Sequence, residues 1–110
     1  MSTDSVAITN LLYRYAECMD NGDFAGAAAL FGNARIRIAA GDDGLVDAAG
    51  ILAVWESSVI RYPDGTPRTK HVLGSVIIDA DEAAGTGTSR CAFTVFQQVG
   101  DTALQPVLSG

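Results

Sequence analysis

Apolar side chains in the first twenty residues recur at steps of three and four, which is the period of an amphipathic helix. The stripe consists of Ile8, Leu11, Leu12, Tyr15 and Met19. Asp4 or Thr3 is placed to cap the start, and Asn21-Gly22 has the composition of a turn that ends a helix. The pattern therefore predicts a first helix over about residues 4 to 20.

Two shorter helical patterns follow, and each begins after an aspartate that can act as its N-cap. The first follows Asp23 and stops at Gly32-Asn33, and its apolar face consists of Phe24, Ala27, Ala28, Leu30 and Phe31. The second follows Asp47, and its apolar side consists of Ile51, Val54, Trp55 and Val59. These patterns predict a second and a third helix.

The segment between these two helices has a different period. Residues 34 to 40 alternate basic and apolar side chains, which is typical of a half-exposed strand. Residues 41 to 44 and 62 to 67 are rich in Gly, Pro and Asp, so we expect a turn and a loop there.

Strand patterns fill the rest of the chain. Residues 68 to 79 and 86 to 100 are predicted to form two long strands joined by a turn. Residues 103 to 110 resemble the start of a third strand, weakened by Pro106. Helices first and strands last indicate an α+β fold, in which an antiparallel sheet wraps around the helices.

Such a fold has a definite core and a definite place for a ligand. We expect the core to consist of Ile8, Leu12, Leu30, Phe31, Trp55, Val76, Ile78, Phe93 and Val95. An antiparallel sheet with one face against helices leaves a concavity, and small-molecule pockets form in such places.

Composition narrows the class of partner. The chain has 110 residues, of which 48% are hydrophobic and 18% charged, so residues 1–110 are expected to form one domain with its own core. The net charge of −6 argues against nucleic acid and anionic membrane surfaces, because both require a basic patch. No run approaches the roughly 18 apolar residues of a membrane helix, and the acidic N-terminus lacks the basic region of a secretory signal.

The number and spacing of the cysteine and histidine residues indicate whether the chain can bind a metal or a cofactor. Cys18 and Cys91 lie in different predicted elements without a CxxC pair, so we interpret them as buried free thiols in a reducing, cytoplasmic compartment. One histidine and two isolated cysteines cannot assemble a zinc site. No Walker A or GxGxxG motif is present, so the sequence predicts chemistry without a metal or a cofactor.

His71 is the only histidine, so any imidazole chemistry must use it. Strict alternation would place it with Leu73 and Ile77 on one face of its strand, and the other face would hold Val72, Val76 and Ile78. A lone histidine among apolar residues is often structural, satisfied by one hydrogen bond. The functional alternative is a general base that burial keeps neutral.

Asp20 and Tyr15 are the candidate partners of His71. An acid at the end of a helix faces the negative end of the backbone dipole, so Asp20 is either a solvated turn residue or an inward carboxylate that needs a partner. An imidazole N–H would satisfy it and form a His–Asp dyad. Tyr15 either packs in the core or directs its phenol to a substrate oxygen. The expected walls of the pocket are Met19, Trp55, Leu73 and Phe93.

The spacing of these residues resembles the SnoaL-like branch of the nuclear transport factor 2-like superfamily, the group of scytalone dehydratase, bile-acid dehydratase and lindane dehydrochlorinase. The family pattern is a first helix ending in Y-x4-D-x-x-D/W and a later strand opening with T-x-H. Here these positions are Tyr15, Asp20, Asp23 and Phe24, followed by Thr69, Lys70 and His71. The resemblance implies a cone-shaped barrel of helices packed in a strongly curved, mainly antiparallel sheet, with an Asp20–His71 dyad in an apolar pocket.

Departures from the family pattern leave the substrate open. Met19 stands where scytalone dehydratase has a tyrosine, and the second histidine of that enzyme is absent here. The bile-acid enzyme has an acidic residue in the strand that corresponds to residues 91 to 98, and this chain has none there. Family members continue with two more strand segments, which leaves a truncated form, a natural short form or completion by a partner as alternatives. The open sheet that results favours a homodimer.

The sequence therefore predicts a lyase or isomerase of the dehydratase or cyclase type, acting without a cofactor on a small, apolar or aromatic, cyclic substrate. His71 and Asp20 are its expected dyad and Tyr15 its proton donor. The alternatives are a non-catalytic domain for ligand binding or dimerisation, and a small subunit like those of ring-hydroxylating oxygenases.

Overall fold

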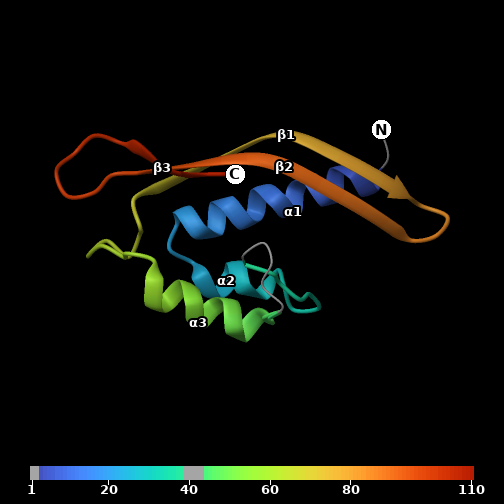
Figure 1. The fold of residues 1–110 in the computed structure, drawn as a ribbon, viewed down its shortest axis with the longest axis horizontal. Helices are drawn as coiled ribbons and strands as arrows, with labels where there is room; N and C mark the ends of the chain where they lie inside the picture. The colour runs from blue at the N-terminus through green and yellow to red at the C-terminus, as the bar shows by residue number, and fades with distance from the viewer. Residues whose placement is uncertain (1–2, 39–43) are drawn as a thin grey trace.

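Three helices precede three strands in the computed structural model, which describes residues 3–38 and 44–110. The helices are α1 (Thr3–Asp20), α2 (Phe24–Ala29) and α3 (Ala48–Ser58), and the strands are β1 (Thr69–Asp81), β2 (Thr86–Gln97) and β3 (Gln105–Ser109). Figure 1 shows α1 lying along the β1–β2 hairpin, with α2 and α3 beyond it. The arrangement is an α+β fold with an antiparallel sheet in the order β1-β2-β3.

Both predicted aspartate caps are confirmed. The Asp23 carboxylate accepts a hydrogen bond from the Gly26 backbone N–H at 2.9 Å, and the Asp47 carboxylate accepts one from the Gly50 N–H at 2.8 Å. Each bond satisfies one of the backbone donors that a helix leaves free at its start. The first helix begins at Thr3, so Asp4 lies within its first turn.

The main cluster of buried side chains lies between the helices. Its central side chains are Met19, Phe24 and Ala27, with Tyr15, Cys18, Leu52, Trp55 and Val59 packed around them. Of the nine core residues expected from the sequence, Val95 is buried and the other eight are half-buried. Several of these eight, such as Leu12 and Phe93, border a cavity between α1 and the sheet, which explains their partial exposure.

A β-bulge changes which side chains of β1 face inward. The register with β2 shifts between Gly74 and Ile77, and Ser75 adopts a left-handed backbone conformation with φ 52°. Because a bulge inserts an extra residue, the alternation restarts after it. Val76 therefore turns inward, and Ile77 is 54% exposed, so its expected place beside His71 is wrong.

The expected strand over residues 34 to 40 is reduced to one bridge. Ile36 and Val46 exchange backbone hydrogen bonds of 2.8 and 2.9 Å, and Ile38 is 54% exposed. A single bridge does not extend into a ladder, so no strand forms over residues 34–38. Residues 39 and 40 of that prediction, and residues 41–43 of the predicted turn, lie outside the described residues.

The tight turn after α1 makes the stability of the fold sensitive to a substitution at Gly22. Gly22 has φ +76°, and a Cβ placed there would collide with the backbone oxygen of Gly65. Gly85 has a similar φ of +70°, but a Cβ there would meet open space. A left-handed alanine costs roughly 1–2 kcal/mol at either site, and only Gly22→Ala must also move a neighbouring backbone.

We therefore expect Gly22→Ala to lower the free energy of unfolding by about 3 kcal/mol or more, as severe local misfits do. The matched control, Gly85→Ala, should lose only about 1–2 kcal/mol. Urea unfolding of both variants measures the difference, and equal losses would contradict the tight approach of Gly22 to Gly65.

Candidate functional site

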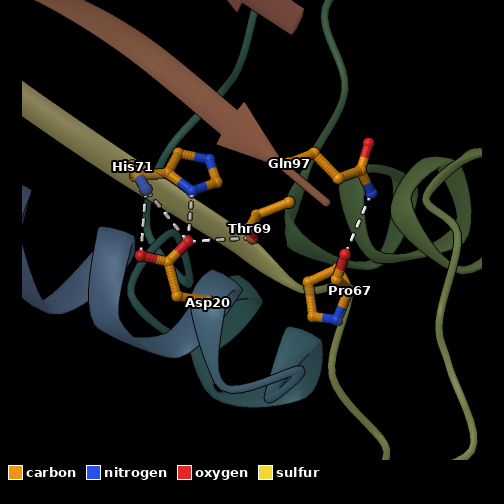
Figure 2. A network of polar contacts seen from close by, with 5 residues as sticks. All are labelled: Asp20, Pro67, Thr69, His71 and Gln97. Carbon is orange, nitrogen blue, oxygen red and sulfur yellow. Dashed lines mark hydrogen bonds and ion pairs between the residues drawn. The ribbon is translucent and has the colours of Figure 1, made fainter. Parts of the chain in front are cut away.

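Asp20 is the last residue of α1, and its carboxylate turns toward the start of β1 (Figure 2). It accepts hydrogen bonds from the Thr69 hydroxyl at 2.9 Å and from the His71 backbone N–H at 3.0 and 3.1 Å. These donors compensate the unfavourable position at the negative end of the helix dipole. Asp20 is therefore held by the sheet rather than solvated as a turn residue.

The His71 side chain contacts the same carboxylate. Its Nδ1 lies 2.6 Å from Asp20 Oδ1, and the two side chains are only 12% and 16% exposed. With Nδ1–H as the donor to this oxygen, Nε2 is the ring nitrogen left to accept a proton. The geometry is that of a carboxylate that selects one imidazole tautomer.

The start of β1 is braced from β2. The Gln97 side chain donates to the Pro67 carbonyl at 3.0 Å, and the Gln98 N–H donates to the Arg68 carbonyl at the same distance. Figure 2 shows Gln97 and Pro67 beside the Asp20 network. Because Pro67 is fully buried, the backbone that carries Thr69 has little freedom to move.

Tyr15 packs directly on His71. Their ring centroids lie 5.8 Å apart in an edge-to-face arrangement, and Tyr15 also contacts Phe31 and Trp55 at 6.0 Å each. Burial, and then the negative charge of Asp20, raise the pKa of the Tyr15 phenol above its ordinary value of 10.0. The phenol therefore stays protonated at neutral pH and remains a hydrogen-bond donor.

This raised pKa predicts a loss of stability at alkaline pH. A group whose pKa is higher in the folded state stabilises the fold below its unfolded pKa, here 10.0, and loses that contribution as the pH rises through the folded value. Tyr15→Phe should therefore lose less stability above pH 10 than the wild type. The tyrosinate absorbance of the wild type minus that of Tyr15→Phe measures the Tyr15 titration directly, and a midpoint at or below the value found in urea would contradict the prediction.

An apolar pocket of about 430 Å³ lies between α1 and the sheet. Antiparallel pairing places His71 opposite Val95 and Leu73 opposite Phe93, so these side chains share the inner face. The lining consists of Leu11, Leu12, Tyr15, Leu30, Phe31, His71, Leu73, Cys91, Phe93, Val95 and Leu108. Its volume falls within the roughly 300–1,000 Å³ of ligand pockets.

A second, more open groove of about 550 Å³ reaches the dyad from a different face of α1. Its polar lining includes Tyr13, Glu17 and Lys70, and it also contains Asp20 and His71. His71 therefore lies between an apolar pocket and a groove open to water, a suitable position for exchanging a proton with solvent.

Two of the four expected pocket residues, Leu73 and Phe93, lie in the apolar lining. Met19 does not, because its side of α1 packs on Phe24 and Ala27, and it is 4% exposed. Trp55 packs in the same helix core and touches the ring of Tyr15, so it supports a pocket residue instead of lining the pocket. Met19 and Trp55 are therefore not among the residues that line this pocket.

Sequence reasoning missed the role of the Thr69 hydroxyl and the place of Cys91 in the pocket. The T-x-H spacing contains the first signal, since residues two apart in a strand point to the same face. Cys91 lies on the inner face of β2 with Phe93 and Val95 for the same reason. Both cysteines are free thiols.

The described residues contain neither a candidate metal site nor a helix that could span a membrane. No cluster of three or more His, Cys, Asp or Glu side chains in residues 3–38 and 44–110 could hold a metal ion. In the same part of the chain, no helix has the length and apolar character needed to cross a membrane.

A family model for SnoaL-like domains matches residues 1–110. The chain therefore belongs to the SnoaL-like family, within the nuclear transport factor 2-like superfamily. This family includes isomerases, dehydratases and ligand-binding members. Comparisons with curated proteins and with solved structures found no match.

Proposed function

We propose that this protein is a cofactor-independent lyase or isomerase, of the dehydratase or cyclase type, in which Asp20 and His71 act as a catalytic dyad. The observation that carries the proposal is the 2.6 Å contact between Asp20 Oδ1 and His71 Nδ1 at the wall of an apolar pocket. A small, largely apolar, cyclic molecule fits such a pocket.

In the proposed reaction, His71 Nε2 takes a proton from a carbon next to a carbonyl group. The electron pair of the broken C–H bond forms a C=C bond, and the carbonyl electron pair moves to the oxygen, which Tyr15 stabilises by a hydrogen bond. Asp20 stabilises the imidazolium that forms. In an isomerisation, His71 returns the proton to a different carbon.

In a dehydration, the electron pair on the enolate oxygen reforms the carbonyl group, and the C=C pair moves to form a double bond to the neighbouring carbon. The C–O bond of that carbon breaks, and its hydroxyl group departs. Tyr15 gives its proton to the departing oxygen, which leaves as water. His71 then returns the abstracted proton to the Tyr15 phenolate; the two rings are neighbours, with centroids 5.8 Å apart. The products are an alkene and one water, and the protein is restored.

The proposal is tested without knowing the natural substrate. In D₂O, the protein should accelerate the exchange of the α-protons of an uncharged cyclic ketone such as 2-tetralone, measured by proton NMR. The rate should saturate with ketone and fall when naphthalene competes for the pocket. Free imidazole at the same concentration is the control, and an exchange rate no higher than that of imidazole would contradict the proposal.

A second candidate function is association through the sheet, and the exposure of β3 supports it. Val107 and Leu108 are 50% and 60% exposed on an edge strand, a feature that free monomers rarely tolerate. A non-catalytic domain for dimerisation or ligand binding would have the same feature. We expect a homodimer in sedimentation experiments, and a monomer at high micromolar concentration would contradict this expectation.

A further inference from the structure

The walls of the apolar pocket carry no Lys, Arg, Asp or Glu side chain among the residues that the structure describes. Their polar atoms are the Tyr15 hydroxyl, the His71 ring and the Cys91 thiol. The pocket lining therefore contains no Lys or Arg side chain that could pair with an anionic ligand. An anion that entered this pocket would lose its hydration shell, and no Lys or Arg side chain of the lining would compensate for that loss.

The charge just behind the pocket wall is negative. The Asp20 carboxylate lies 2.6 Å from His71 Nδ1, and after burial it is the second cause of the raised pKa of Tyr15, so its negative charge acts on both polar side chains. Lys70, the nearest cation on β1, lines the open groove on a different face of α1. Its charge is therefore exposed to water, where it is screened.

From this distribution of charge we infer that the pocket selects uncharged carbonyl compounds and rejects carboxylates of the same shape, with the ligand oxygen facing Tyr15 and the apolar body facing residues such as Leu11, Phe93 and Leu108. The orientation of the oxygen rests on the donor role of Tyr15 in the proposed function. The charge selectivity rests on the lining of the pocket and on the Asp20 carboxylate behind it, and does not depend on a catalytic role of the dyad.

A matched pair of probes tests the inference. 2-Acetylnaphthalene and 2-naphthoate share a ring and nearly the same shape, but at pH 8 only the second is charged. Calorimetric titration of the full chain should show the ketone binding at least about tenfold more tightly, because the anion loses its hydration without gaining a partner. Equal binding of the two, tighter binding of naphthoate, or no binding of the ketone would overturn the inference.

Two variants identify the source of the selectivity. Tyr15→Phe should weaken ketone binding by about two- to tenfold, the range of one hydrogen bond, and leave naphthalene binding unchanged. Tyr13→Phe is its control, because Tyr13 is 47% exposed and lines the groove instead. Asp20→Asn should narrow the difference between ketone and naphthoate, since it removes the negative charge. Ketone binding that depends equally on Tyr13 and Tyr15 would also overturn the inference.

These titrations, taken together with the α-proton exchange experiment, separate this inference from the proposed function. Ketone selectivity without catalysed α-proton exchange would leave the inference standing and remove the catalytic role of the dyad. Catalysed exchange combined with equal binding of ketone and naphthoate would support the catalytic role of the dyad and overturn the inference.

Discussion

Replacing His71 with alanine is expected to reduce the catalysed exchange of ketone α-protons by about 10²–10⁴-fold, the usual contribution of general acid–base catalysis. His71 is the only imidazole in the chain, and no other base in the pocket lining replaces it at neutral pH. The fold should persist, because Asp20 keeps its hydrogen bonds from the Thr69 hydroxyl and the His71 backbone N–H.

His71→Gln is the matched control for this loss. A glutamine side chain can still donate a hydrogen bond toward Asp20, but it cannot act as a base at neutral pH. Catalysis should therefore be lost in both variants, while His71→Gln keeps more of the stability. Exchange rates in either variant close to the wild-type rate would contradict the assignment of His71 as the base.

The second large effect is expected from Asp20→Asn. The asparagine amide can donate to Nδ1, which would place the ring proton on Nε2 and leave no free electron pair toward the pocket. The same change in a serine-protease triad costs roughly 10⁴ in rate through the wrong tautomer, and we expect a loss approaching this size in ketone exchange. Urea unfolding should show a much smaller effect, because one amide oxygen still accepts from the sheet.

Thr69→Val separates hydrogen bonding from charge in the same site. It removes one of the donors to Asp20 Oδ1 and leaves the carboxylate charge in place. An exchange rate in Asp20→Asn as high as in the wild type would show that the carboxylate does not orient His71. A loss of rate in Asp20→Asn well beyond that in Thr69→Val is the expected result.

The sequence allowed the prediction of the three helices, the long strands and the contact between Asp20 and His71, because their evidence is local or comes from the family pattern. Helical stripes, aspartate caps and turn composition are readable within a few residues. The spacing of Tyr15, Asp20 and His71 could be compared directly with the SnoaL-like pattern. An inward carboxylate at Asp20 needs a partner, and the imidazole N–H of His71 is a suitable one.

The errors concern features that depend on contacts between distant segments. The bulge at Ser75 restarts the alternation of β1, and no rule of strict alternation anticipates an inserted residue. Met19 lies on the apolar stripe of α1, but the stripe is wide enough to face both the helix core and the pocket. Ile36 and Val46 pair only once, because a strand forms only where a neighbouring segment continues the ladder.

The most direct test of the central claim is the nitrogen-15 NMR spectrum of the imidazole in protein without a histidine tag, where every imidazole signal belongs to His71. Between pH 7 and 8 we predict a protonated Nδ1 and an unprotonated Nε2 in the wild type, and the opposite tautomer in Asp20→Asn. A wild-type ring protonated mainly on Nε2, or a spectrum that Asp20→Asn leaves unchanged, would contradict the claim that Asp20 holds His71 as a base facing the pocket.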